Sequence, residues 1–292
     1  MITFILPTKN RVKTLNIFFK NTYKKFNKLN PNYLIIDASN NKNHFQNKKN
    51  LKNYKKIKII RQKTKGIQMG CIEAIPFIKT KYVTFLYDDD VMGQYVIDIY
   101  KKNMKNSDTF SLGCGIVQDI KKKNKFQKLN YLTLNKKDIL SCYYGSSFRK
   151  ILRLNKINKK LALPVSPICT SFRTEFLIKW KKILFNFTKK SDFRNYIFFK
   201  KDVGPDMIIY LMQLNDSKNY VNFYYPHSVK FSSHNNSISI IYGNNFLRIG
   251  YWLARICFFK NKKFEDLKIK NNYYTYLIII GLILIFTNLR VG

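Results

Sequence analysis

Hydrophobic residues in the first third of the chain are grouped in short runs that alternate with stretches of helical periodicity. The runs occupy residues 2–6, 33–36, 57–60 and 82–87. Apart from Thr3, Lys58 and Thr84 they consist of apolar residues, which predicts strands buried on both faces. Apolar residues at helical spacing follow the first run, between 15 and 23, and precede the last, between 66 and 77. Strands that alternate with helices predict an α/β fold with a mainly parallel sheet and helices on both faces.

The rest of the chain predicts fewer elements. The pattern indicates a helix at residues 94–106, a strand at 109–118, a turn leading into a strand and a helix at 166–180, a Tyr-rich strand at 219–226 and a helix at 246–259. Residues 119–161 are rich in Lys and Asn with few periodic cues, so we expect a variable insertion or lid there. His44 falls in another stretch rich in Asn and Lys, which we interpret as a loop without a functional role.

Three acidic residues, Asp88, Asp89 and Asp90, end the buried run at residues 82–87. Adjacent carboxylates repel one another unless positive charge lies beside them, and their oxygens are the ligands that Mg²⁺ and Mn²⁺ prefer. The chain has only 16 acidic residues beside 54 basic ones, so three acids in a row are unusual for it. The carboxyl end of a central strand is also where open α/β sheets bind ligands. The triplet therefore indicates a metal site, and a solvated acidic turn is the structural alternative.

Polar residues follow the other predicted strands as well, and the carboxyl ends of parallel strands meet at one edge of a sheet. They are Thr8, Asn10, Arg11, Asp37, Lys63 and Lys65. Neither G-x-G-x-x-G nor a G-K-[ST] loop follows the first strand, which argues against a Rossmann dehydrogenase or a P-loop nucleoside triphosphatase. A carboxylate can bind a base N–H, cations can bind phosphate, and a metal at the triplet can bridge a diphosphate. Together these residues describe a site for a nucleotide diphosphate.

The chain is strongly basic, with a formal net charge of +38. Such a charge is typical of proteins that bind nucleic acid or anionic membranes. Lys is, however, enriched together with Asn, Ile, Phe and Tyr, which all have A/T-rich codons, and the lysines are scattered through every segment. No recognition helix, zinc finger or RNA-binding signature accompanies them. We therefore attribute the charge to a biased genome and expect no nucleic-acid partner.

Cysteine spacing and the two ends of the chain bear on location. The five cysteines are far apart and form no C-x-x-C pair, which favours a reducing compartment and argues against structural zinc. The chain starts directly with a strand pattern, so we expect no signal peptide and a cytoplasmic protein. Residues 273–289 are strongly apolar and follow a Lys-rich stretch. They fit either a peripheral contact with the cytoplasmic face of the inner membrane or a terminal helix packed on the domain.

Four segments, in the order ITFILPTKNR, LIIDAS, KGIQMGCIEAI and YVTFLYDDD, resemble the nucleotide-binding half of the GT-A-fold glycosyltransferases of the family 2-like group. The resemblance covers about residues 1–118. It implies that Asp37 meets the base of a nucleotide sugar and that Asp88 and Asp90 form a D-x-D motif, in which both acids are metal ligands and the first also contacts the donor ribose or sugar. It also implies that further residues lie along the donor. These are Pro7, Thr8, Asn10, Arg11, Lys65 and Asp89.

Two residues in the second half extend this resemblance. Gly204 and Pro205 predict a turn, and Asp206 then falls at a helix start, where a carboxylate commonly caps free N–H groups. In the resembled family a glycine and an acidic pair open this helix and carry the catalytic base of inverting enzymes; Pro205 replaces the first acid, so the role falls to Asp206. His234, in FSSHNNSIS, matches a C-terminal histidine that serves as an additional metal ligand.

The resemblance implies a Rossmann-like GT-A domain and a hexosyltransferase-type enzyme that depends on Mn²⁺ or Mg²⁺. It would transfer a sugar, with inversion, from a nucleotide-diphospho-sugar to a hydroxyl of a saccharide or glycolipid, in the synthesis of surface polysaccharide or glycoconjugates. Residues 1–118 would then bind the donor, 119–240 would bind the acceptor and carry catalysis, and 241–292 would form a helical, apolar extension. Two alternatives stay open: a sugar-phosphate nucleotidyltransferase, whose fold is similar, and a basic nucleic-acid- or membrane-binding protein without enzymatic activity.

Overall fold

In the computed structural model, the chain divides into two compact units. The first comprises Met1–Leu177 and Asp216–Ser232, and the second comprises Ile178–Asn215 and Ser233–Gly292. The structure describes residues 1–92, 109–114, 133–134, 171–189, 201–216, 220–225, 229–230, 238, 240–243, 246–247, 250–251 and 254. The division of the chain into segments that end at residues 118 and 240 stays a prediction.

A sheet with the strand order β3-β2-β1-β4-β8 forms the centre of the first unit. Its parallel strands are β1 (Ile2–Thr8), β2 (Asn32–Asp37), β3 (Ile57–Arg61) and β4 (Tyr82–Phe85), and β8 (Phe172–Arg173) pairs antiparallel with β4. The mainly parallel α/β sheet that the hydrophobic runs predict is therefore confirmed. Thr8 pairs with Asp37, and Asp37 pairs with Arg61, so the carboxyl ends of three strands are level with one another.

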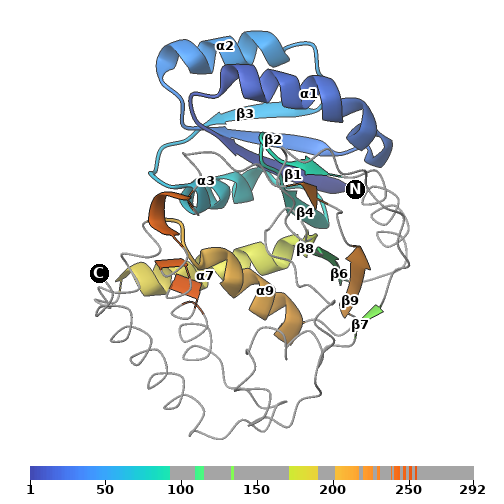
Figure 1. Cartoon of the computed structure of the whole chain (residues 1–292), viewed down its shortest axis with the longest axis vertical. Helices are drawn as coiled ribbons and strands as arrows, with labels where there is room; N and C mark the ends of the chain where they lie inside the picture. Colours follow the sequence, from blue (N-terminus) through green and yellow to red (C-terminus); the bar gives the residue numbers. More distant parts are fainter. Residues whose placement is uncertain are drawn as a thin grey trace, which may run out of the picture. The chain divides into compact units, whose positions relative to one another are not determined.

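Helices cover both faces of this sheet (Figure 1). α1 (Val12–Phe26), followed by the 3₁₀ turn η1 (Asn27–Leu29), and α2 (Asn41–Leu51) lie on one face, and α3 (Ile67–Ala74), followed by η2 (Ile75–Phe77), lies on the other. Aromatic side chains fill the layer under α1: Phe4 contacts Phe26 and Phe19 contacts Tyr33, with ring centroids 5.0 and 5.5 Å apart. Burying each such side chain contributes roughly 1.5–3 kcal/mol, which holds α1 on the sheet.

The helix α2 was not predicted, and the expectation that His44 lies in a loop is wrong. The segment is so polar that it shows no hydrophobic period. One local feature and one tertiary feature make it helical. Asn40 caps its first turn by accepting a hydrogen bond from the backbone N–H of Asn43, at 2.9 Å, and Asn47 and Leu51 are buried. The polar composition of this segment is therefore the reason that the helix was not predicted, although its cap and its buried side chains stabilise it.

Two small sheets complete the first unit. β5 (Val91–Met92) pairs antiparallel with β10 (Val229–Lys230), and β9 (Tyr220–Tyr225) lies between β6 (Thr109–Cys114), to which it is parallel, and β7 (Thr133–Leu134), to which it is antiparallel. Two of these strands were predicted, β6 and β9. The predicted helix at 94–106, most of the insertion at 119–161 and the apolar segment at 273–289 lie outside the described residues. In the part of the chain that is described, no helix is both long enough and apolar enough to cross a membrane.

The second unit contains most of α7 (Thr174–Lys189) and the helix α9 (Pro205–Asp216). Trp180 of α7 is fully buried, and its indole N–H donates a hydrogen bond to the carbonyl of Pro205 at 2.8 Å. Gly204, just before α9, has a φ of +100°, and a Cβ there would lie 2.7 Å from the carbonyl oxygen of Gly250. Only glycine fits this turn without strain. These contacts hold the start of α9, and with it Asp206, in one place.

Candidate functional site

The carboxyl ends of the parallel strands form one edge, and backbone hydrogen bonds join the loops that leave it. The N–H of Ala38 donates to the carbonyl of Thr8 at 2.9 Å, and the N–H of Gln62 donates to the carbonyl of Asp37 at 3.0 Å. The polar residues predicted at this edge therefore belong to loops that are tied to their neighbours. The acidic triplet follows β4, which lies beside β1 in the sheet.

Arg11 neutralises the acidic triplet. Its Nη1 lies 2.7 Å from Oδ1 of Asp88 and 2.8 Å from Oδ2 of Asp89, and Oγ1 of Thr8 donates to Oδ2 of Asp88 at 3.0 Å. Asp88 and Asp90 are buried, with 6% and 7% of their surface exposed. Burial raises the pKa of Asp88, and Arg11 and Thr8 offset part of that rise. The triplet is therefore a partly buried carboxylate cluster that forms ion pairs with the guanidinium of Arg11. A solvated acidic turn would not show such burial and pairing.

Carboxylate oxygens such as those of Asp88 and Asp90 are the ligands that a hard divalent cation prefers. Mg²⁺ is commonly held by one or two carboxylates together with the phosphates of a substrate and water, so a complete cage of protein ligands is not required. Both oxygens of Asp88 already accept hydrogen bonds. His234, the third predicted ligand, lies outside the described residues. Among the residues that are described, no group of three His, Cys, Asp or Glu side chains is placed to hold a metal.

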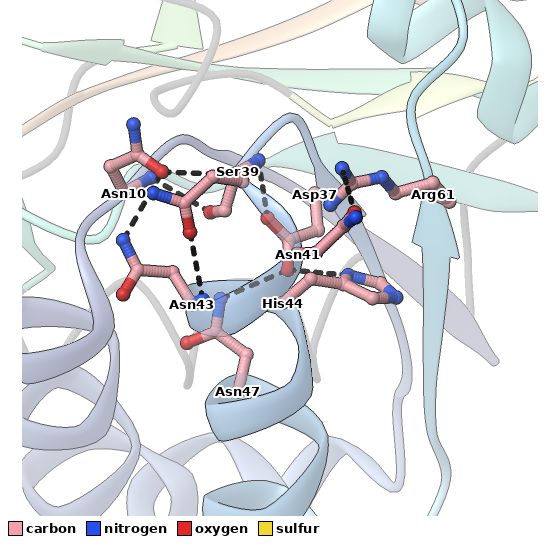
Figure 2. Close-up of polar contacts among 9 residues, drawn as sticks. Asn10, Asp37, Ser39, Asn41, Asn43, His44, Asn47 and Arg61 are labelled. Atoms are coloured by element: carbon pink, nitrogen blue, oxygen red, sulfur yellow. Dashed lines mark hydrogen bonds and ion pairs between the residues drawn. The ribbon is translucent and has the colours of Figure 1, made fainter.

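Asp37 is fully buried at the end of β2, and its carboxylate is surrounded by donors (Figure 2). Oδ1 accepts a hydrogen bond from the N–H of Ser39 at 2.8 Å. Oδ2 accepts one from Nδ2 of Asn47 at 2.9 Å and lies 2.8 Å from Nδ1 of His44. Burial alone would raise the pKa of Asp37, but the hydrogen bonds from Asn47, Ser39 and His44 outweigh it and leave the pKa below its ordinary value. The carboxylate is therefore ionised at neutral pH and engaged inside the protein.

Asn10 joins the loop after β1 to the loop after β2, as Figure 2 also shows. Its backbone N–H donates to Oγ of Ser39 at 2.7 Å, and its Oδ1 accepts from the N–H of Asn40 at 2.9 Å and from Nδ2 of Asn43 at 3.2 Å. Its φ is +54°, a left-handed conformation that asparagine tolerates better than most residues. The predicted contacts of Asn10 and Asp37 with a nucleotide stay predictions, and Oδ1 of Asn10 and both oxygens of Asp37 are already hydrogen-bonded within the chain.

The loop between β3 and α3 carries Lys63 and Lys65, both exposed. Glu73 of α3 accepts hydrogen bonds from the N–H groups of Lys63 and Thr64, at 2.9 and 2.7 Å, and these bonds, with that from the Thr64 hydroxyl, lower its pKa despite partial burial. Nε2 of Gln62 donates to the carbonyl oxygens at 64 and 66, at 2.6 and 2.7 Å. The loop therefore presents its two lysines from a backbone that is held by side chains.

Asp206 is the second residue of α9, in the second unit. It is 9% exposed, and within the described residues its Oδ1 has no hydrogen-bond partner. Burial raises its pKa to about 6, although the backbone N–H of Met207 lowers it in part. An ionisable group whose pKa lies near the working pH is suited to accept a proton in a reaction. The predicted helix start at this residue is confirmed.

Sequence reasoning missed the residues that support the predicted ones. His44 and Asn47 hold Asp37, and Gln62 and Glu73 hold the lysine loop. For α2 a signal existed, because Asn40 followed by Asn43 fits an N-cap. For Glu73 no local signal existed, since its partners lie nine and ten residues earlier in the chain.

Comparison with solved structures identifies the fold. The chain matches the crystal structure of S. aureus TarS 1-349 in complex with UDP-GlcNAc over 98% of its own length and 72% of that chain, with a TM-score of 0.57 and 12% identity. It matches the same fragment in complex with UDP over 96% and 70%, with a TM-score of 0.52 and 12% identity. The likeness confirms the predicted GT-A fold.

The longer crystal structure of S. aureus TarS gives the same result. The match covers 96% of this chain and 42% of that chain, with a TM-score of 0.52 and 12% identity. The chain therefore spans less than half of that protein. No protein-family model matches the chain, and no curated protein matches its sequence.

Proposed function

We propose that the protein is a glycosyltransferase that moves a sugar from a nucleotide-diphospho-sugar to a hydroxyl group of a saccharide or glycolipid. The observation that carries the proposal is the buried acidic cluster bound by Arg11 at the carboxyl edge of a parallel sheet. Exposed lysines on the loop after β3, at the same edge of the sheet, would add positive charge for a diphosphate. The likeness in fold to TarS, which was crystallised with UDP-GlcNAc, supports a donor of this class.

Metal dependence is part of the proposal. Asp90 and Asp88, with His234, would hold Mn²⁺ or Mg²⁺, which when bound neutralises charge on the departing diphosphate. Arg11 stays protonated, because Asp88 and Asp89 raise its pKa more than burial lowers it. It can therefore serve as a fixed positive charge beside the phosphates, together with Lys65. Stabilising charge that develops on the leaving group is commonly a large part of such catalysis.

Asp206 is proposed as the general base. Its carboxylate, with a pKa of about 6, would accept the proton of the acceptor hydroxyl while that oxygen attacks the anomeric carbon and the bond to the nucleotide diphosphate breaks. Attack on the face opposite the leaving group inverts the configuration at that carbon. We place the reaction at the cytoplasmic side of the cell, in the synthesis of surface polysaccharide or glycoconjugates.

Calorimetric titration with UDP and with GDP, each with and without Mn²⁺, tests the proposal. We expect one of the nucleotides to bind with a Kd in the micromolar range and to require the metal. Asp90→Asn should weaken binding in the presence of Mn²⁺ at least tenfold and leave thermal unfolding unchanged, because one amide oxygen is a poorer ligand than a carboxylate. If none of UDP, GDP, CDP and ADP binds, the proposed function is wrong; if Asp90→Asn binds as the wild type does, the metal assignment is wrong.

A further inference from the structure

Asp37, the residue expected to contact the nucleobase, is buried inside the protein. The Asp37 side chain has no exposed surface, and its two oxygens already have three partners, the N–H of Ser39, Nδ2 of Asn47 and Nδ1 of His44. A carboxylate that is buried and satisfied in this way has no oxygen to offer to a ligand at the sheet edge. If a base binds here, another group must recognise it.

His44 is the partner of Asp37 that reaches the surface. Its side chain is 14% exposed, whereas Asn47 is 1% exposed. An ionised carboxylate only accepts hydrogen bonds, so the proton between them is on Nδ1 of His44. In that tautomer Nε2, on the far side of the ring from Asp37, carries the lone pair that can accept a hydrogen bond (Figure 2). Asp37 therefore fixes both the orientation and the tautomer of His44, as carboxylates do for metal-bound histidines.

Its neighbours place His44 at the same edge as the other loops. It lies in the first turn of α2, next to Asn41, whose Oδ1 accepts a hydrogen bond from Arg61 at 3.1 Å. Arg61 pairs with Asp37 in the sheet and ends β3. His44 is thus bonded to the end of β2, in a helix whose first residue is bonded to the end of β3.

We propose that His44, and not Asp37, recognises the nucleobase of the donor, by accepting at Nε2 a hydrogen bond from a ring N–H of the base. This inference rests on the proposed function. Uracil carries such a hydrogen on N3 and guanine carries one on N1, whereas cytosine and adenine carry none at the corresponding ring nitrogen. Asp37 is then a positioning residue, and the site selects nucleotides with a protonated ring nitrogen.

Two substitutions separate the roles of the two imidazole nitrogens. In His44→Asn the amide nitrogen takes the place of Nδ1, so the donor to Asp37 is kept and Nε2 is lost. In His44→Gln the amide reaches the place of Nε2, so an acceptor is kept and the bond to Asp37 is lost. The affinities of UDP, CDP, GDP and ADP are measured by calorimetry with Mn²⁺ for both variants and the wild type. UDP is compared with CDP, and GDP with ADP, because the members of each pair have the same ring system.

We expect the wild type to prefer UDP to CDP, or GDP to ADP, by at least tenfold, which one hydrogen bond to a buried partner can supply. His44→Asn should unfold at the wild-type temperature and reduce this preference to within about threefold, and His44→Gln should keep it. A wild type that binds without a preference, or a His44→Asn variant that keeps the preference, would overturn the inference and leave the proposed function intact. If His44→Asn does not fold, loss of the preference in His44→Gln overturns it as well. A wild type that binds none of the four nucleotides overturns both.

Discussion

Asp206 is the residue whose replacement tests the reasoning about the site most directly. It is 9% exposed, and burial raises its pKa from 3.8 to about 6. A difference of about 2 pH units between the folded and unfolded chain means that the ionised carboxylate destabilises the folded chain by about 3 kcal/mol. Asp206→Asn removes this charge, but burying an amide that lacks a hydrogen-bond partner reduces the gain in the free energy of unfolding by about 1 kcal/mol. We therefore expect the variant to gain about 2 kcal/mol in its free energy of unfolding at pH 8.

The gain has a defined dependence on pH. Because folding raises the pKa of Asp206, its protonated form contributes stability that is fully present below pH 3.8 and is lost as the pH rises through about 6. Asparagine resembles the protonated acid at every pH. The advantage of Asp206→Asn should therefore be absent at pH 4, grow between pH 4 and 6, and stay constant above that range.

Urea denaturation at several pH values from 4 to 8, followed by circular dichroism, measures this difference. Glu175→Gln is the matched control, because Glu175 also lies in the first turn of a helix but its side chain is 49% exposed, and its replacement should change stability by less than about 0.5 kcal/mol. If Asp206→Asn is no more stable than the wild type at pH 8, or if the difference is the same at pH 4 and pH 8, folding does not raise the pKa of Asp206 as we infer. The same variant should lose about 10²- to 10⁴-fold in transfer rate, with little change in donor affinity.

Two further substitutions test the neighbouring parts of the structure. Arg11→Met should lower the free energy of unfolding by about 2 kcal/mol at pH 7.5, a value below that for a fully buried pair because the guanidinium is 32% exposed. The loss should shrink as the pH is lowered and Asp88, whose pKa is raised, takes up a proton, and a loss that is independent of pH would point to packing of the Arg11 side chain instead. Gly204→Ala should destabilise the chain by at least about 2 kcal/mol, because the new Cβ meets the carbonyl of Gly250 at a φ of +100°. Gly243→Ala, at a φ of +69° with open space around it, should lose only about 1 kcal/mol by the same denaturation assay, and equal losses at the two positions would contradict the steric argument.

Much of the parallel sheet could be predicted because its signals are local. The four strands of the parallel sheet are short runs made mostly of apolar residues, and their alternation with helices leaves few possible topologies. The polar residues after each strand converge because parallel strands end at the same edge, which follows from the topology. The start of α9 could also be predicted from a local signal, since glycine, proline and aspartate are each favoured at the start of a helix.

What each polar residue does at that edge depended on partners far away in the chain. Asp37 and Asn10 are typical ligand-binding residues by type and position, yet their polar groups hold neighbouring loops together, and no pattern near Asp37 shows that His44 would face it from a helix. Arg11 reaches the acids 77 and 78 residues later only because β1 and β4 are adjacent in the sheet. The burial that raises the pKa of Asp206 also requires the folded second unit. Periodicity and turn chemistry are properties of short segments and so can be read from the sequence alone, whereas burial, hydrogen-bond satisfaction and charge pairing are set by segments that only the tertiary structure brings together.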